Sequence, residues 1–115
     1  IKGKMKKNYL LLTIDDGFES FYVNAWPVLK KREIPFILFI STREVGKSGY
    51  MTWKQIKEIQ SSNLATIGNH SHSHEYLADM SNEEIKKRIR WNFQLLANIN
   101  HSSRIGLGWN SFPLA

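Results

Sequence analysis

Short apolar runs alternate with amphipathic segments along this chain of 115 residues, and this alternation constrains its fold more than any other feature. Strands that alternate with helices predict an α/β fold with a parallel sheet. A weaker apolar run at 105–109 is a possible fourth strand. The three stronger runs, which are typical of strands buried on both faces, are residues 9–14, 35–41 and 64–67.

Helix boundaries follow from caps and prolines. Thr52 with Gln55, and Ser81 with Glu84, form capping-box patterns that predict the starts of two helices. An earlier helix is expected from about 24 to 32, because Pro27 is tolerated only in a first turn. Residues 18–22 before it are expected to form an irregular turn. The side chains expected to face the core are Trp26, Leu29, Ile56, Ile59, Ile85, Ile89, Phe93 and Leu96.

Length and composition favour one globular domain over residues 1–115, beginning with a basic tail at 1–7. Hydrophobic residues make up 42% of the chain, enough for a core, and cysteine is absent, which excludes disulfides and thiolate metal ligands. We expect no integral membrane segment and no signal peptide in this chain. The net charge of +6 comes without a nucleic-acid-binding motif, so no nucleic-acid partner is expected.

Two groups of polar side chains follow predicted strands. Asp15 and Asp16 come after the first apolar run, and three of the four histidines, His70, His72 and His74, follow the third. The carboxyl ends of parallel strands lie at one edge of the sheet, where functional residues gather. Carboxylates and imidazoles are ligands for divalent metals, and a carboxylate off the metal can act as a general base.

The spacing of the histidines leaves two geometries open. If residues 70–74 are extended, His70 and His74 lie about 13 Å apart, and only neighbours such as His70 and His72 can share an ion. If they form a helical turn, His70 and His74 approach within about 6 Å and can chelate together. His72 then points elsewhere.

Residues 12–18 (Leu-Thr-Ile-Asp-Asp-Gly-Phe) resemble the Thr-Phe-Asp-Asp-Gly motif of the polysaccharide deacetylases, carbohydrate esterase family 4. Residues 68–74 (Gly-Asn-His-Ser-His-Ser-His) are similar to that family's His-(Ser/Thr)-x-x-His motif, which is commonly preceded by Gly-Asn. Residues 34–36 and 50–53 are similar to its connecting segments. The resemblance covers about residues 8–80.

The resemblance implies that Asp16, His70 and His74 hold a divalent metal, most often Zn²⁺. Asp15 would be the general base that activates water at the metal, and Ser71 would fix the loop between the histidine ligands. Of the two geometries left open by the spacing, the resemblance therefore implies the helical turn, in which His70 and His74 share the ion. The implied reaction is the metal-dependent removal of N-acetyl groups from a glycan, such as one of N-acetylglucosamine, at an extracytoplasmic location.

The family's third motif is represented by residues 111–115 (Ser-Phe-Pro-Leu-Ala), which lack its second aromatic residue and its arginine. Phe112, Pro113 and Leu114 would line the site together with Asn69. The family's later motifs, including the histidine that acts as general acid, are not in this chain. Members form a distorted (β/α) barrel of about seven units, so we expect a truncated barrel of three or four, with marginal stability or oligomerisation.

Two alternatives compete with the deacetylase. One is an incomplete, inactive barrel fragment that binds metal or glycan without turnover. The other is an amidohydrolase-like metal hydrolase that uses a His-x-His pair, either His70 with His72 or His72 with His74. It requires further downstream histidines, and only His101 is present.

Overall fold

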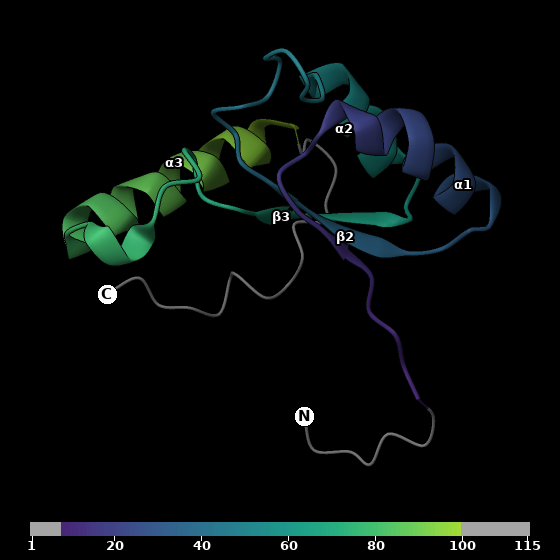
Figure 1. Cartoon of the computed structure of the whole chain (residues 1–115), viewed down its shortest axis with the longest axis horizontal. Coiled ribbons are helices and arrows are strands. Elements are labelled where there is room, and N and C mark those ends of the chain that lie inside the picture. Colours follow the sequence, from purple (N-terminus) through teal and green to yellow (C-terminus); the bar gives the residue numbers. More distant parts are fainter. Residues whose placement is uncertain (1–7, 100–115) are drawn as a thin grey trace.

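The strands form one parallel sheet in the order β1-β2-β3 in a computed structural model that describes residues 8–99. β1 is Thr13–Ile14, β2 is Phe36–Ile40 and β3 is Ala65–Asn69. Ile14 lies beside Leu38, and Ile40 lies beside Asn69, so the carboxyl ends of the strands meet at one edge. Helices α1 and α2 lie together over one face of the sheet (Figure 1). The predicted α/β fold with parallel strands is confirmed.

The hydrophobic core lies between β2 and the helices. Alternate residues of β2 (Phe36, Leu38 and Ile40) are buried because successive side chains of a strand point to opposite faces. Ile37 and Phe39, on the other face, are only half-buried. β2 is therefore the central strand, but its two faces are covered unequally. The remaining core residues are Phe21, Trp26, Met51, Ile56, Ile59, Ile67 and Leu96.

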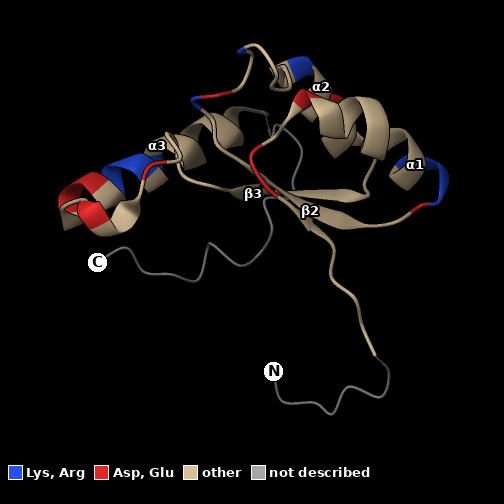
Figure 2. Cartoon of the chain, viewed as in Figure 1, with Lys and Arg blue, Asp and Glu red and all other residues tan. Residues whose placement is uncertain are grey.

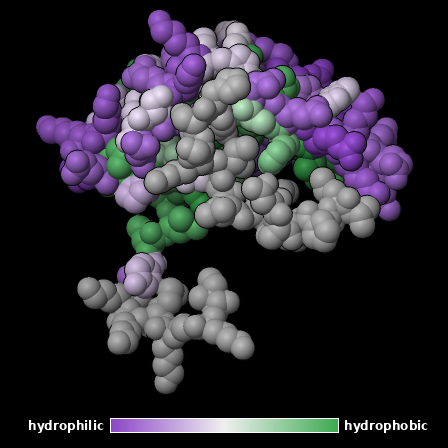
Figure 3. Space-filling model, turned by 180° about the vertical axis from the view of Figure 1, so that it is seen from behind, coloured by the Kyte–Doolittle hydropathy of each residue, from purple (hydrophilic) through white to green (hydrophobic). Residues whose placement is uncertain are grey.

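The first apolar run does not form the predicted strand over its whole length. Only Thr13–Ile14 pairs with β2, and Tyr9, Leu10 and Leu11 are 71%, 97% and 70% exposed. Hydrophobic surface appears where the described chain begins, seen from behind (Figure 3). The prediction of a strand buried on both faces was wrong for residues 9–11, because β1 is an edge strand and nothing in the described residues covers these three side chains, whereas Leu12 packs against the core.

The first helical segment begins earlier than predicted. A π-helical turn (Phe21–Ala25) leads directly into α1 (Trp26–Lys31), where Trp26 N–H donates to the Phe21 carbonyl. Pro27 does lie in the first turn of α1, as expected. The expectation of an irregular turn at 18–22 was wrong, because the wider π register continues the helical backbone up to the proline.

Helix α2 (Trp53–Ser61) begins at the predicted capping box, in which Thr52 Oγ1 accepts from Gln55 N–H and Gln55 Oε1 accepts from Thr52 N–H. Ile56 and Ile59 are buried as predicted. β3 continues two residues beyond the predicted end, through Asn69. His70 therefore follows the strand directly.

Helix α3 (Asn82–Ile99) begins at the second predicted capping box, between Ser81 and Glu84. A short 3₁₀ turn (Leu77–Asp79) precedes it. Its first turn is acidic and basic residues follow (Figure 2). Of the four apolar positions predicted for its inner face, Leu96 is buried and the other three, Ile85, Ile89 and Phe93, are half-buried.

Several predictions fall outside the described residues. These are the basic tail at 1–7, the fourth strand at 105–109, His101, and the lining residues Phe112, Pro113 and Leu114. Within residues 8–99, no helix combines the length and apolar character that crossing a bilayer requires.

Candidate metal centre

Asp16 reaches the site on a turn that passes over the end of β2. Asp16 and Gly17 have φ angles of +74° and +85°, in the left-handed region that favours glycine. A Cβ added at Gly17 would lie 2.8 Å from Ile40 Cδ1. Glycine here lets the backbone fold down on β2, so the aspartate side chain bridges the gap of about 10 Å between β1 and β3.

The histidine loop, residues 70–74, is neither extended nor helical. Ser71 and His74 have φ angles of +61° and +53°, so the backbone reverses within five residues. Ser71 N–H donates to Asn69 Oδ1 at 2.9 Å, and His74 N–H donates to Ser71 Oγ at 3.1 Å. The expected helical turn was wrong. The loop still brings His70 and His74 together, with ring centroids 4.9 Å apart.

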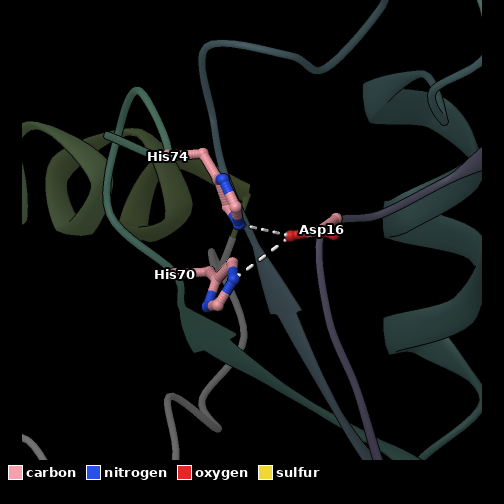
Figure 4. A group of neighbouring side chains, drawn as sticks. All are labelled: Asp16, His70 and His74. Carbon is pink, nitrogen blue, oxygen red and sulfur yellow. Dashed lines mark ion pairs between the residues drawn. The ribbon is translucent and has the colours of Figure 1, made fainter. Parts of the chain in front are cut away.

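Three side chains converge at this edge of the sheet (Figure 4). His70 Nε2 lies 3.1 Å from Asp16 Oδ1, and His74 Nε2 lies 3.0 Å from the same oxygen. The side chains of Asp16 and His70 are 26% and 30% exposed, whereas that of His74 is 56% exposed. The group is therefore sheltered on one side and open to solvent on the other.

The chemistry of this group fits a divalent metal. Asp16 Oδ1 is buried and receives no hydrogen bond of good geometry from any described residue, although both imidazole nitrogens point toward it. Tetrahedral zinc with bonds of about 2.0–2.2 Å separates its ligand atoms by about 3.3 Å, close to the spacing here. One carboxylate and two imidazoles with an open side are typical of catalytic zinc sites.

His72 lies apart from this group. Its Nδ1 is 2.8 Å from Thr42 Oγ1, and its ring meets Trp91 edge to face with centroids 5.5 Å apart. Burial lowers the pKa of His72, and the positive charges of Arg88 and Arg43 lower it further. The His-x-His alternative requires His72 to share an ion with a neighbour, and this geometry does not favour it.

The other predicted site residues lie around the group in different ways. Asp15 precedes Asp16 and is exposed, while Gly17 N–H donates to its carbonyl at 2.9 Å. Asn69 joins the loop to α3, because its amide donates to the Ile89 carbonyl at 3.0 Å.

Sequence reasoning missed the polar residues beneath the loop. Ser41, Thr42 and Asn92 are all buried, and each makes a hydrogen bond to the loop. One signal was available for Asn92. It occupies the same helical stripe as Ile89 and Leu96, where an apolar residue is expected.

A groove of about 400 Å³ lies beside the histidines. Its lining combines the loop residues His70 and His74 with Tyr76, Leu77 and the α3 residue Ile89. This volume is at the lower end of the range for small-molecule sites, and its lining is mixed polar and apolar.

Comparison with known proteins gives a consistent family. The family model described as polysaccharide deacetylase matches residues 2–107. A poly-β-1,6-N-acetyl-D-glucosamine N-deacetylase from Staphylococcus aureus (strain MRSA252) is 32% identical over 91 residues, which cover 75% of this chain. The match spans only 31% of that relative's length.

Solved structures of deacetylases have a fold similar to that of this chain. The Streptococcus pyogenes deacetylase PplD, in complex with acetate, superposes with a TM-score of 0.76 at 26% identity, covering 84% of this chain and 42% of that one. IcaB from Ammonifex degensii gives a TM-score of 0.56 at 30% identity, over 77% of this chain and 42% of that one. The strands and helices described here thus correspond to part of a deacetylase (β/α) barrel.

Proposed function

This chain belongs to the polysaccharide deacetylase family, and from that premise we propose that it is a metal-dependent hydrolase that removes N-acetyl groups from a glycan. The observation that carries the proposal is that His70 and His74 both point a ring nitrogen at one buried oxygen of Asp16, which receives no hydrogen bond of good geometry from the described residues. Zinc is the proposed metal, because its preferred ligands match this set.

Each residue has a role in this proposal. Asp16, His70 and His74 hold the ion. A divalent ion bound there would polarise the acetamide carbonyl and make water more acidic. Asp15, which is exposed and not part of the converging group, accepts the proton from the attacking water. The water oxygen bonds to the carbonyl carbon, and the C–N bond breaks as the nitrogen takes up a proton from solvent. Acetate and a free amine result, and Asp15 releases its proton to solvent.

The proposed substrate is a polymer containing N-acetylglucosamine, by analogy with the staphylococcal relative that is named for this substrate. The groove beside His70 and His74 offers space for a sugar unit next to the metal group. Asn69 and Ser71 would support the ligands, and Phe112, Pro113 and Leu114 would line the site. From the family resemblance we also propose an extracytoplasmic location, whether periplasmic, cell-surface or secreted.

The test measures zinc content and acetate release from N-acetylglucosamine oligomers. We expect one zinc per chain in the wild type and in Asp15→Asn, and none in Asp16→Ala. Asp79→Ala, which removes an exposed carboxylate outside the group, is the control and should match the wild type. Asp15→Asn should slow acetate release by at least about 100-fold, because it removes the general base.

Each proposed role can fail separately. Zinc retained by Asp16→Ala would overturn the ligand set, and zinc that depended on His72 instead would restore the His-x-His alternative. Unchanged acetate release in Asp15→Asn would remove Asp15 as the base. A wild type that binds one zinc and releases no acetate would favour the alternative of a chain that binds metal or glycan without turnover.

A further inference from the structure

We propose that Asn92 of α3, acting together with Thr42 and His72, is a positioning residue that holds the histidine loop in its metal-binding shape. This inference rests on the proposed metal role of His70 and His74. It explains two residues that the proposed metal site does not use. These are Asn92, a buried asparagine on an apolar helix stripe, and His72, a histidine that is not a proposed ligand.

Asn92 is fully buried and joins α3 to two other segments. Its amide nitrogen donates to the Ile40 carbonyl at 2.7 Å and to the carbonyl of Ser71, which lies inside the loop. Because carbonyl oxygens only accept hydrogen bonds, the amide nitrogen must be the atom that faces them. One side chain thus ties the end of β2 to the backbone between the two proposed ligands.

The position of Asn92 argues for a specific role. A leucine there would continue the apolar stripe, but the Ile40 carbonyl would then lose one donor and the Ser71 carbonyl would lose the donor it has here. Asn92 Oδ1 is itself buried without a hydrogen bond in the described part of the chain. Buried polar atoms are usually paired, so an unpaired one points to a benefit elsewhere. We place that benefit in the loop.

The backbone of the loop is bonded along the segment that follows β2. His70 N–H donates to the Ile40 carbonyl at 3.2 Å, and Arg43 N–H donates to the His72 carbonyl at 2.8 Å. Ser41 Oγ donates to the His70 carbonyl at 2.8 Å. The bond from Asn92 to the Ser71 carbonyl adds a contact to the loop from α3.

The loop needs such support because of its backbone conformation. Ser71 and His74 both have positive φ angles although neither is glycine. Such conformations persist where the surrounding structure holds them. A loop released from Asn92 would lose part of what keeps the two imidazoles aimed at Asp16.

His72 completes the arrangement through Thr42. The Asn92 amide lies 3.3 Å from Thr42 Oγ1, which is 2.8 Å from His72 Nδ1. Both hydrogens of the Asn92 amide already serve the Ile40 and Ser71 carbonyls, so the longer contact with Thr42 Oγ1 shares one of them, and the Thr42 hydroxyl can donate its own hydrogen to the ring nitrogen. This bond turns the His72 ring away from the metal group and toward Trp91. The middle histidine is therefore an anchor of the loop.

The first experiment compares zinc affinity, measured by chelator competition, in Asn92→Leu and Leu96→Ala. Leu96 is buried one turn along the same helix and has no bond to the loop, so its truncation controls for general loosening of α3. With circular dichroism showing both variants folded, we expect Asn92→Leu to bind zinc at least about tenfold more weakly than the wild type. Leu96→Ala should stay within about twofold of it.

Equal zinc affinity in Asn92→Leu and the wild type would overturn the inference, as would an equal loss in both variants. A second pair tests the anchor. Thr42→Val removes the hydroxyl at nearly constant size and should weaken zinc binding several-fold. Thr42→Ser keeps the hydroxyl and should restore affinity close to the wild type. Equal behaviour of these two variants would remove Thr42 and His72 from the arrangement.

Amide hydrogen exchange without metal separates this inference from the proposed function. Asn92→Leu should speed exchange at the His70 and Arg43 amides and leave the Ile56 amide, which bonds within the α2 cap, unchanged. Unchanged exchange at His70 and Arg43 would refute the positioning role. A wild type that binds no zinc but shows this exchange pattern would refute the metal proposal alone.

Discussion

The proposed metal ligands follow the two outer strands of the sheet, β1 and β3, and different contacts hold these two sides of the site in place. The aspartate side is the edge strand β1 with its following turn, residues 9–17. The histidine side is the end of β3 with the histidine loop, residues 65–74. Backbone bonds hold the first, including Ile37 N–H to Leu12 and Met51 N–H to Gly17. Hydrogen bonds with β2, its following segment and α3 hold the second.

The two sides therefore differ in how firmly the protein holds them before any ligand binds. The histidine side is shaped in advance by buried polar groups, whereas the aspartate side depends on a two-residue strand and an exposed apolar run. Elements with few buried contacts open at low free energy. A ligand that joins the two sides should therefore stabilise the aspartate side most.

The largest expected effect is that of zinc on stability. At a free zinc concentration of 100 times its dissociation constant, the free energy of unfolding should rise by about 2.7 kcal/mol. Hydrogen exchange should slow more at the Ile37 and Met51 amides than at the Arg43 amide, which is already held. Equal slowing on both sides would break the comparison. Asp16→Ala is the control in which zinc should have no effect.

An effect of similar size is expected from Gly17→Ala, which acts on the aspartate side. The added Cβ meets Ile40 Cδ1 and must adopt a φ of +85°, so the free energy of unfolding should fall by about 2–3 kcal/mol. Gly46→Ala is a matched control, because Gly46 has a φ of +84° and nothing within 4 Å of its added Cβ. It should cost about 1 kcal/mol. Equal losses in urea titrations would mean that contact with β2 does not matter.

The smallest effect concerns the start of α3, which supports the histidine side. Hydrogen bonds from the Ser81 backbone and side chain lower the pKa of Glu84. A lowered pKa in the folded state stabilises the protein above the unfolded value near 4.5, and this stabilisation is lost as pH falls through the folded value. Glu84→Gln should therefore lower the urea midpoint slightly at pH 7 and leave it unchanged near pH 3.

Glu83→Gln is the control for this pH experiment. Its carboxylate lies in the same helical turn but pairs with Lys86 at 3.6 Å instead of capping the helix. A pH dependence equal to that of Glu84→Gln would assign the effect to the charge of the first turn and not to the cap.

Local signals predicted much of this fold. The capping boxes at Thr52 and Ser81 fixed two helix starts because they are short-range and self-contained. The apolar residues 9–11 were wrongly expected to be buried, because apolar composition leads to burial only where another element packs against the run. The π turn before Pro27 was also hidden, since no residue type specifies the wider register.

The site shows the same division. Residue type and strand-end placement predicted that aspartates and histidines meet at this edge of the sheet, and the family resemblance selected Asp16, His70 and His74, which do lie in one group. The shape of the histidine loop was not predictable, because it depends on Asn92 and Ser41, which lie far from it in sequence. Asn92, a polar residue on the apolar stripe of α3, was the sequence signal that indicated this support.

The convergence of Asp16 with His70 and His74 also has a topological consequence. A chain without cysteine cannot form a disulfide, yet an ion bound by these three residues would cross-link two segments separated by most of the sheet. Closing a long loop restricts the unfolded chain only if the link survives unfolding. Coordination at this site would be lost on unfolding, so the ion would act as a reversible clasp that a chelator can remove.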